Sequence, residues 1–241
     1  MLTDRYRDRL YVVLVRTRNP LNLGAAARAM SNFGFRQLRV VQPYELAFRE
    51  ARSAVGAAEL LKNTQEYGTV AEAVSDCDLV IGTTAIGKRQ LQNPVHTLDI
   101  GAKMIRQRLG TGRVAILFGS EKTGLSNEDL SHCHEVLHIP TRPEHLAMNL
   151  AQAVAVTLYE LSRQHGRKQP KAHPPSASAA ELERLTQALA EAAAKSGFFT
   201  EASATAREQK LRRLIRRLGL QPDDAQILLA LARQILWKMQ G

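Results

Sequence analysis

The sequence predicts an α/β fold with a mostly parallel sheet, followed by a smaller helical unit. Runs of β-branched and other apolar residues at 11–15, 79–83 and 114–118 indicate strands that are buried on both faces. Helical segments separate these runs, and such alternation is typical of a parallel sheet that helices cover on both sides. Beyond Gly166 no further strand is indicated, so the last part of the chain is expected to be helical.

Each element of the α/β part has its own local signal. Pro20 suits the first turn of a helix, and Ser126 is a favourable N-cap with Asp129 in the first turn. The expected strands are 11–15, 37–41, 79–83, 114–118 and 135–139. The expected helices are 20–33, 45–61, 70–74, 99–109, 126–132 and 149–164.

Three segments of different composition follow one another along the chain. Residues 1–165 form the α/β domain, and 181–241 form a helical extension. The segment 166–180 between them contains Pro170, Pro174 and Pro175 and is expected to be an exposed linker. Within the extension, helices are expected at 180–195, 206–218 and 223–239.

The middle helix of the extension combines an apolar stripe with many cations. Helical spacing places four apolar side chains on one face, namely Leu211, Leu214, Ile215 and Leu218. The other sides carry Lys210, Arg212, Arg213, Arg216 and Arg217. Two interpretations stay open, a solvated basic face and a surface that meets nucleic-acid phosphates.

Composition and charge narrow the class of partner. The 241 residues include 33 Lys and Arg against 23 Asp and Glu, a net charge of +10 that favours a polyanion such as nucleic acid. No apolar run is long enough to span a bilayer, and the charged N-terminus does not resemble a signal peptide. With only Cys77 and Cys133, a disulfide framework is not expected, which fits the cytoplasm.

Three polar blocks, each preceded by an expected strand, are the most informative motifs. They occupy residues 19–30, 117–125 and 139–150. Because ligands bind beyond the carboxyl ends of parallel strands, the three blocks are expected to form one composite site. Each block also has a simpler interpretation than a binding site. The Ala-rich first block could serve helix packing, Glu121 could be a solvated loop residue, and Asn149 could cap a helix.

Several other site types are not supported by the spacing. The second block lacks the lysine of a P-loop, and no G-x-G-x-x-G fingerprint occurs. Neither Ser120 nor Ser126 has an evident base beside it. A metal site is not expected either, because the spacing of His132, Cys133, His134 and His138 differs from that of zinc sites.

Together the three blocks resemble the motifs of the SPOUT superfamily, in its SpoU/TrmH branch of RNA 2′-O-methyltransferases. The resemblance is closest to the TrmJ type and includes Gly-Thr-Thr-Ala at 82–85 and Arg-Pro-Glu-His at 142–145. It extends into the tail at 196–199 and 210–214 and so covers nearly the whole chain.

The resemblance implies a fold, a cofactor and a set of site residues. It implies a deep trefoil knot at about 114–164, S-adenosyl-L-methionine as cofactor, and a homodimer whose sites are built across the interface. The residues that match the cofactor pocket are Thr83, Thr84, Ala85, Gly119, Ile139, Leu146, Ala147 and Met148. Arg28 matches the catalytic arginine of the family, and Asn22, Glu121 and Asn149 match its other polar motif residues.

The implied reaction is methylation of a ribose 2′-hydroxyl in tRNA, at a cytidine or uridine that begins the anticodon loop. The chain departs from the TrmJ pattern where Leu146 and Ala147 replace two serines and Ser120 replaces an arginine. Two alternatives remain open, a ribosomal RNA 2′-O-methyltransferase and a non-catalytic RNA-binding protein on the same fold. Neither a metal nor a membrane partner is expected.

Overall fold

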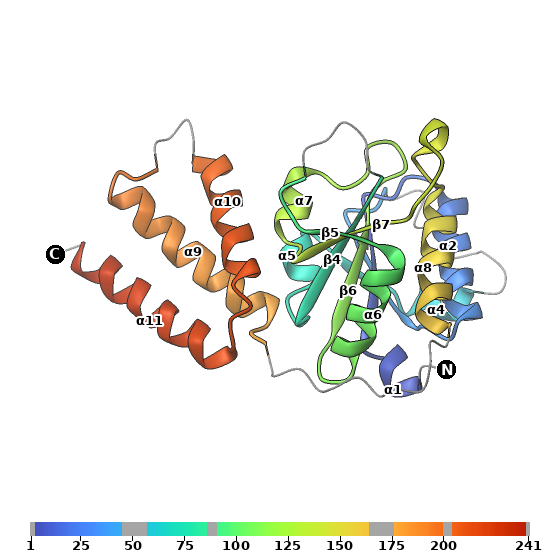
Figure 1. The fold of residues 1–241 in the computed structure, drawn as a ribbon, viewed down its shortest axis with the longest axis horizontal. Coiled ribbons are helices and arrows are strands. Elements are labelled where there is room, and N and C mark those ends of the chain that lie inside the picture. Colours follow the sequence, from blue (N-terminus) through green and yellow to red (C-terminus); the bar gives the residue numbers. More distant parts are fainter. Residues whose placement is uncertain (1–2, 45–56, 86–90, 164–175, 200–203, 240–241) are drawn as a thin grey trace.

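The centre of the protein is a seven-stranded sheet in which all paired strands run parallel. The computed structural model describes residues 3–44, 57–85, 91–163, 176–199 and 204–239. The strand order is β3-β2-β1-β6-β4-β7-β5 (Figure 1). The strands are Leu10–Val15 (β1), Gln37–Val41 (β2), Gln65–Tyr67 (β3), Leu79–Thr84 (β4), Val95–Thr97 (β5), Val114–Phe118 (β6) and Glu135–His138 (β7).

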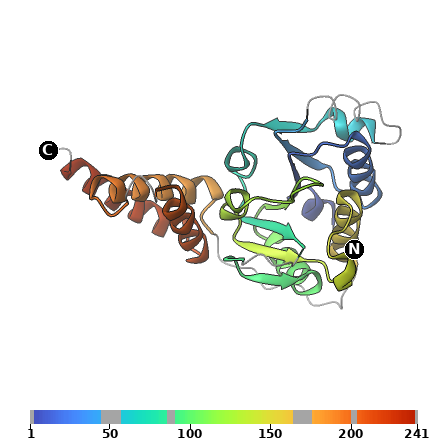
Figure 2. The same ribbon diagram turned by 90° about the horizontal axis from the view of Figure 1, so that it is seen from above.

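Helices cover both faces of the sheet. One face carries α2 (Pro20–Asn32), α4 (Ala58–Lys62), α6 (Leu98–Leu109) and α8 (Leu150–Ser162), which share one apolar core (Figures 1 and 2). The short helices α5 (Val70–Ala73) and α7 (Asn127–Ser131) contribute to a second core on the other face. Helix α1 (Asp4–Arg7) precedes β1.

Strand β1 shows how the sequence builds these two cores. Leu10, Val12 and Leu14 belong to the first core, whereas the alternate residues of the strand belong to the second. Side chains alternate between the faces of a strand, so a strand that is covered on both faces needs apolar residues at every position. The predicted α/β class and the largely parallel sheet are therefore confirmed.

All five predicted strands are present, but the two short strands β3 and β5 were not predicted. Each has three residues at one edge of the sheet and a mostly polar sequence, so neither gives the apolar signal of a buried strand. Of the predicted helix at 45–61, residues 45–56 lie outside the described part, and α4 begins at Ala58. The predicted helix at 126–132 is confirmed, and Ser126 caps it.

Three helices follow the α/β part, as predicted: α9 (Ala179–Lys195), α10 (Ala204–Arg217) and α11 (Pro222–Lys238). They share a core of their own and project from the side of the sheet that carries α5 and α7 (Figure 2). The backbone N–H groups of Ala179 and Ala180 donate to the carbonyl oxygens of Cys77 and Ser75 at 2.9 and 3.0 Å. The start of α9 is thus attached to the α/β part.

The expectation of an exposed linker over 166–180 is wrong at its end. Ala177 and Ala179 are buried, because the first turn of α9 packs against the loop after α5 and against Leu220. Residues 166–175 lie outside the described part of the chain.

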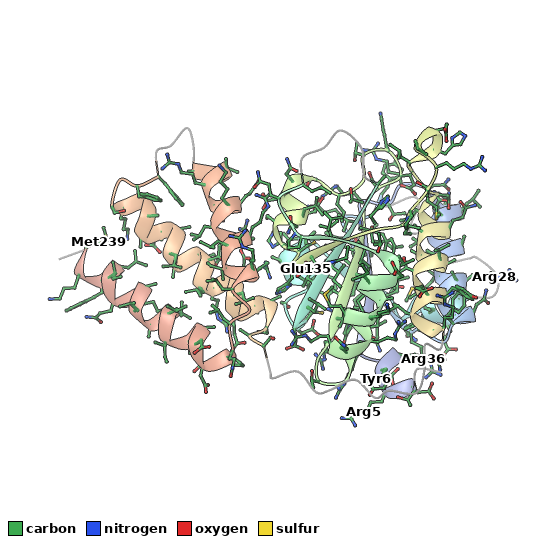
Figure 3. The ribbon with its side chains drawn as sticks, in the orientation of Figure 1. Arg5, Tyr6, Arg28, Arg36, Glu135 and Met239 are labelled. Carbon is green, nitrogen blue, oxygen red and sulfur yellow. The ribbon has the colours of Figure 1, made fainter. Side chains whose placement is uncertain are left out.

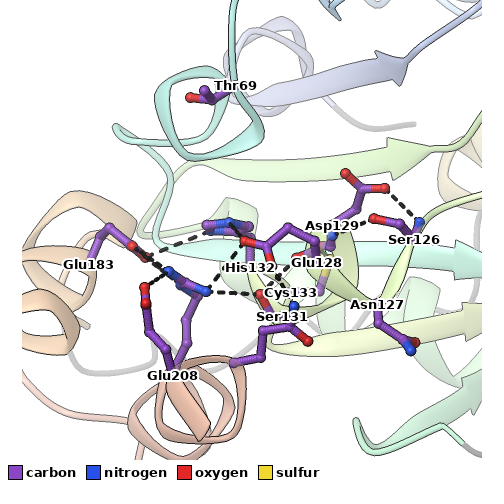
Figure 4. Close-up of polar contacts among 12 residues, drawn as sticks. Thr69, Ser126, Asn127, Glu128, Asp129, Ser131, His132, Cys133, Glu183 and Glu208 are labelled. Atoms are coloured by element: carbon purple, nitrogen blue, oxygen red, sulfur yellow. Dashed lines mark hydrogen bonds and ion pairs between the residues drawn. The ribbon is translucent and has the colours of Figure 1, made fainter. Parts of the chain in front are cut away.

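The basic helix α10 buries two of its arginines, so the two interpretations, a solvated face and a phosphate-binding surface, are both wrong for Arg212 and Arg216. Arg212 and Arg216 are 5% and 3% exposed, whereas Leu214 and Leu218 are 42% and 56% exposed. The physical reason is that acidic side chains from three helices converge on this face of α10 (Figure 4). Glu183 of α9 is within 3.2 Å of nitrogens of both arginines.

The same contact holds α10 against α7. Arg212 also pairs with Glu208 at 2.7 Å and lies 3.6 Å from Glu128 of α7. His132, at the end of α7, is buried between Glu183 and Glu128 (Figure 4). Burial, and then the charges of Arg216 and Arg212, lower the pKa of His132 to about 4 despite the two carboxylates.

Two further sequence expectations concern the environment of the chain. Among the described helices, none is long and apolar enough to cross a membrane. Cys77 and Cys133 are both buried free thiols, and burial raises the pKa of Cys133 to about 12. Both cysteines therefore act as small apolar core residues.

Candidate active site

The first motif block forms the loop after β1 and the start of α2. Asn19 is the N-cap of α2, since its side-chain oxygen accepts the N–H of Leu21 at 2.9 Å, and Pro20 opens the helix. Gly24, Ala26 and Ala27 lie further along α2 and are buried, in a helix that packs against α8. These small residues serve packing, as the simpler interpretation held.

The second block is a tight turn directly after β6. The N–H of Gly124 donates to the carbonyl oxygen of Ser120 at 2.9 Å, and Gly124 has φ +66°. A Cβ atom at Gly119 would stand 2.1 Å from the carbonyl carbon of Gly124 and 2.2 Å from the N atom of Leu125. Only glycine permits this close approach of backbone to backbone.

The third block leaves β7 and leads into α8. A short 3-10 helix, Pro143–His145, precedes the carbonyl of Leu146, which accepts the Thr141 hydroxyl at 3.1 Å. Asn149 caps α8, since its side-chain oxygen accepts the N–H groups of Ala151 and Gln152 at 2.9 and 3.3 Å. The capping role considered for Asn149 is thus present.

Together with the end of β4, the second and third blocks enclose a cleft of about 370 Å³. All eight residues proposed for the cofactor pocket line this cleft. They are Thr83, Thr84, Ala85, Gly119, Ile139, Leu146, Ala147 and Met148. Sequence reasoning did not single out Phe118, Leu137 and Thr141, which also line it. Phe118 and Leu137 are buried strand residues, so their sequence signal is indistinguishable from that of the core.

A chain of polar side chains joins the three blocks at the rim of the cleft. The side-chain N–H of Asn149 donates to the Oδ1 atom of Asn22 at 2.9 Å, and Asn22 donates to Glu121 Oε1 at 3.0 Å. Glu121 also accepts the backbone N–H groups of Arg18 and Asn19, each at 3.2 Å. The carboxylate of Glu121 therefore orients an amide and holds the loop after β1.

The electrostatics of Glu121 agree with this role. Burial alone would raise the pKa of its carboxyl group, but the hydrogen bonds from Asn22 and from the two backbone N–H groups lower the pKa below its usual value. An ionised carboxylate is acceptor-only, which suits three donors at once. The group is thus held as an anion and is poorly suited to give up a proton.

Arg28 lies apart from the other three polar residues. It is exposed on α2, two turns beyond the N-cap, and it does not line the cleft (Figure 3). Three of the four predicted polar residues, Asn22, Glu121 and Asn149, are thus brought together within one chain. Arg28 points outward from α2, away from the sheet (Figure 3).

The histidine- and cysteine-containing segment 132–138 has a structural role. The Nδ1 atom of His134 accepts the backbone N–H of Val80 at 3.0 Å, and burial lowers the pKa of this histidine to about 3. Across the described ranges, no group of three His, Cys, Asp or Glu side chains is arranged to hold a metal ion.

A parallel sheet with a cleft at its carboxyl edge, framed by three glycine- and asparagine-marked loops, defines the class of protein. The family model described as the SpoU rRNA Methylase family matches residues 9–159. The chain belongs to this family.

Among its relatives are proteins of the TrmJ type. The chain is 40% identical over 155 residues to the tRNA (cytidine/uridine/adenosine-2′-O-)-methyltransferase TrmJ of Pseudomonas aeruginosa, covering 64% of this chain and 60% of that one. This match spans less than two thirds of the relative's own length. The tRNA (cytidine/uridine-2′-O-)-methyltransferase TrmJ of Salmonella typhimurium is 31% identical over 237 residues, 95% of this chain and 97% of that one.

The fold is also shared with a solved TrmJ structure. The crystal structure of TrmJ from Z. mobilis ZM4 superimposes with a TM-score of 0.81 at 33% sequence identity. The match covers 93% of this chain and 98% of that one, so it includes the C-terminal helices.

Proposed function

We propose that this protein transfers a methyl group from S-adenosyl-L-methionine to a ribose 2′-hydroxyl of tRNA. The observation that carries the proposal is the convergence of the three motif blocks on one cleft, with Asn149, Asn22 and Glu121 linked at its rim. The TrmJ relatives and the net charge of +10 support tRNA as the substrate.

The cleft suits the proposed cofactor in size and in chemistry. Its volume of about 370 Å³ lies in the range of small-molecule sites. Leu137, Ile139 and Met148, which line the cleft, would offer apolar contact to an adenine ring, and the backbone groups of 146–148 would offer hydrogen bonds to its edge. When bound, S-adenosyl-L-methionine supplies an activated methyl group on a sulfonium centre.

The polar residues would prepare the ribose for transfer. Glu121 fixes Asn22 and the loop after β1, so that the acceptor nucleotide meets a preorganised wall of the cleft. Arg28 is expected to hold the phosphate next to the target ribose and to lower the pKa of its 2′-hydroxyl. A guanidinium is protonated below pH of about 12, so electrostatic stabilisation suits Arg28 better than proton abstraction.

Because Arg28 does not line the cleft of its own chain, we propose that it acts in the cleft of a second copy. The outer face of α2 and α8 supports a homodimer, since Leu21, Val156 and Tyr159 are 78%, 36% and 55% exposed there. Exposed apolar side chains on two adjoining helices are typical of a protein interface.

The finer organisation of the fold is part of the same proposal. We propose a trefoil knot at about 114–164, where the chain passes from β6 through β7 to α8. We also propose a cytoplasmic location for the protein, which fits tRNA as the substrate. The order β6-β4-β7-β5 supports the knot, since β7 inserts between two earlier strands before α8 returns to α2. Residues 1–165 would be the catalytic domain and 181–241 a C-terminal domain with its own apolar core.

The first test is methyl transfer from labelled S-adenosyl-L-methionine into unmodified bulk tRNA and, in parallel, into ribosomal RNA. We expect label in tRNA, mapped to a cytidine or uridine at the start of the anticodon loop. If only ribosomal RNA is labelled, the protein is a 2′-O-methyltransferase whose substrate is ribosomal RNA and not tRNA. Bound cofactor without transfer to either RNA would instead indicate an RNA-binding protein.

The role of Arg28 is tested by complementation between two inactive variants. Arg28→Ala is expected to bind cofactor and lose turnover, whereas Gly119→Ala is expected to lose cofactor binding, because its Cβ has no space. If sites are built across a two-fold interface, co-refolding the two variants in equal amounts should restore about a quarter of wild-type activity. Absence of any recovery would indicate that each chain uses its own Arg28.

A further inference from the structure

Arg16 joins the loop that carries the first motif block to the helix that follows the second. It comes directly after β1, and its guanidinium meets the carboxylate of Asp129 in α7 with both terminal nitrogens. The Nη1 atom lies 3.1 Å from Oδ1, and Nη2 pairs with Oδ2. Such a two-pronged contact fixes the direction as well as the distance between two segments.

The backbone at Arg16 is shaped for this contact. Arg16 has φ +53°, a conformation uncommon for residues with a side chain, while its N–H still donates to the carbonyl of Val41 at 2.8 Å. An uncommon backbone conformation persists only where surrounding contacts stabilise it, and it is often found at functional sites. Here it turns the side chain of Arg16 from the strand end toward α7.

The partner of Arg16 is a buried anion with a second task. The Asp129 side chain is only 3% exposed, and its Oδ2 atom also accepts the N–H of Ser126 at 2.6 Å (Figure 4). Asp129 thereby fixes the start of α7, directly after the turn 120–124. Arg16 is the cation that pairs with this buried carboxylate, and removing one partner of such a pair leaves the other charge uncompensated.

A second bridge runs in the opposite direction. Glu121 of the second block accepts the backbone N–H groups of Arg18 and Asn19, two and three residues after Arg16. The segment 16–22 is thus attached to 121–129 in three ways: by the side chain of Arg16, by the backbone of Arg18 and Asn19, and by the side chain of Asn22. The Oδ1 atom of Asn22, at the end of this segment, accepts the side-chain N–H of Asn149.

We propose that Arg16 is a positioning residue for methyl transfer, which acts through Asp129 to keep Asn22 and Glu121 in register at the rim of the cleft. The inference rests on the proposed methyltransferase function. Arg16 does not line the cleft, so its loss should remove no direct contact to the cofactor. It should instead misplace the residues that meet the acceptor ribose, and small displacements of such groups lower turnover steeply.

The test compares Arg16→Gln, Arg16→Lys and a matched control, Arg36→Gln. Arg36 is an exposed charge just before β2, at the amino ends of the strands, whereas Arg16 follows the carboxyl end of β1. We expect Arg16→Gln to lower kcat by about a hundredfold, with KM for tRNA and the cofactor Kd within twofold of wild type. Arg16→Lys should recover only part of kcat, since an ammonium group cannot reproduce the fork. Arg36→Gln should match the wild type.

A double-variant cycle tests whether Arg16 acts through Asp129. Arg16→Gln combined with Asp129→Asn should be no slower than the slower single variant. The rate of amide hydrogen exchange at residues 16–22 should rise in Arg16→Gln and stay unchanged in Arg36→Gln. This measurement detects loss of the contact between Arg16 and Asp129 and does not depend on catalytic activity.

Three results would overturn the inference. They are wild-type kcat in Arg16→Gln, losses that multiply in the double variant, and a raised KM for tRNA at unchanged kcat, which would make Arg16 a direct RNA contact. Wild-type protein that transfers no methyl group to any RNA would instead overturn the proposed function. The failure of the function and the failure of the positioning role are thereby distinguishable.

Discussion

The side chains of Asn149 and Asn22 are hydrogen bonded at 2.9 Å although 127 positions separate them in the sequence. Asn149 uses its two side-chain atoms for different tasks, since its oxygen caps α8 and its N–H group holds Asn22. The stability of α8 and the geometry of the cleft rim thus depend on opposite ends of one amide.

Asn149→Asp separates these two tasks. A carboxylate still accepts the N–H groups of Ala151 and Gln152, so the thermal unfolding midpoint should stay within a few degrees of the wild type. It has no donor for Asn22, so methyl transfer should fall at least about tenfold, the loss for one hydrogen bond of about 1.4 kcal/mol. Asn149→Ala should lose both the cap and the donor, so it should also unfold at a lower temperature; wild-type activity in Asn149→Asp, or equal unfolding midpoints in the two variants, would contradict the assignment.

Glu121→Gln replaces one acceptor oxygen with a donor that faces other donors. Either orientation of the new amide leaves at least one of the three N–H groups from Arg18, Asn19 and Asn22 without an acceptor. We expect turnover to fall about 10- to 100-fold, since hydrogen bonds to charged groups contribute about 1.5–3 kcal/mol. Single-turnover methyl transfer at saturating cofactor measures this directly.

The pH profile provides a control for Glu121. The pKa of this carboxyl group is below its usual value in the folded chain, so its contribution to stability is present at neutral pH and is lost as the pH falls through that lowered value. The wild type should therefore show no loss of kcat from Glu121 between pH 5 and 8. If kcat of the wild type does change with pH in this range, and the change is absent in Glu121→Gln, then Glu121 exchanges a proton during the reaction.

Glu183→Gln should loosen the C-terminal helices. It removes the anion that lies between the buried cations Arg212 and Arg216. Breaking a buried ion pair from one side costs about 3–5 kcal/mol. Unfolding of these helices is followed by the fluorescence of Trp237, the one tryptophan of the chain, which lies on α11.

The matched control is Glu191→Gln. Glu191 forms an exposed pair with Lys195 on the same helix, and its removal should cost less than about 1 kcal/mol. Urea unfolding should therefore show a lower midpoint for Glu183→Gln and little change for the control. Equal midpoints for the two variants would mean that the buried cluster contributes little.

Folding stability should decline as the pH falls from about 6.5 toward 4. The pKa of His132 in the folded chain is about 4, below its ordinary value of 6.5, so over this interval the unfolded chain binds the proton and the folded chain does not. His132→Gln should flatten this decline, whereas His145→Gln, at an exposed position, should not. Urea midpoints measured at several pH values provide the comparison.

The sequence predicted the parts of the fold that have strong local signals. Strands such as 114–118 are apolar at every position, and Ser126 and Asp129 mark the start of a helix. The three motif blocks predicted the cleft, because parallel strands necessarily bring their carboxyl ends to one edge. The edge strands β3 and β5 are mostly polar and lack such a signal. They are strands because they hydrogen bond to a neighbouring strand, which local sequence does not reveal.

Pairings between distant residues were beyond local patterns. Helical spacing on α10 assigned the arginines to the outside, but Glu183, Glu128 and Glu208 made burial of Arg212 favourable. The bridge from Arg16 to Asp129 likewise joins residues that are 113 positions apart. Glu208 lies four residues before Arg212 on the same helix, but Glu183, Glu128 and Asp129 lie in other elements, so no spacing rule within one helix or loop would find them.

The position of β6 has a consequence for the chain while it is being synthesised. Strands β1 and β4 are both paired with β6, which begins at Val114 and is therefore synthesised after both of them. Until then, each of the two presents an unpaired apolar edge, a hazard for association with other nascent chains. Protection of these two edges during translation is therefore a requirement that this protein places on the cell.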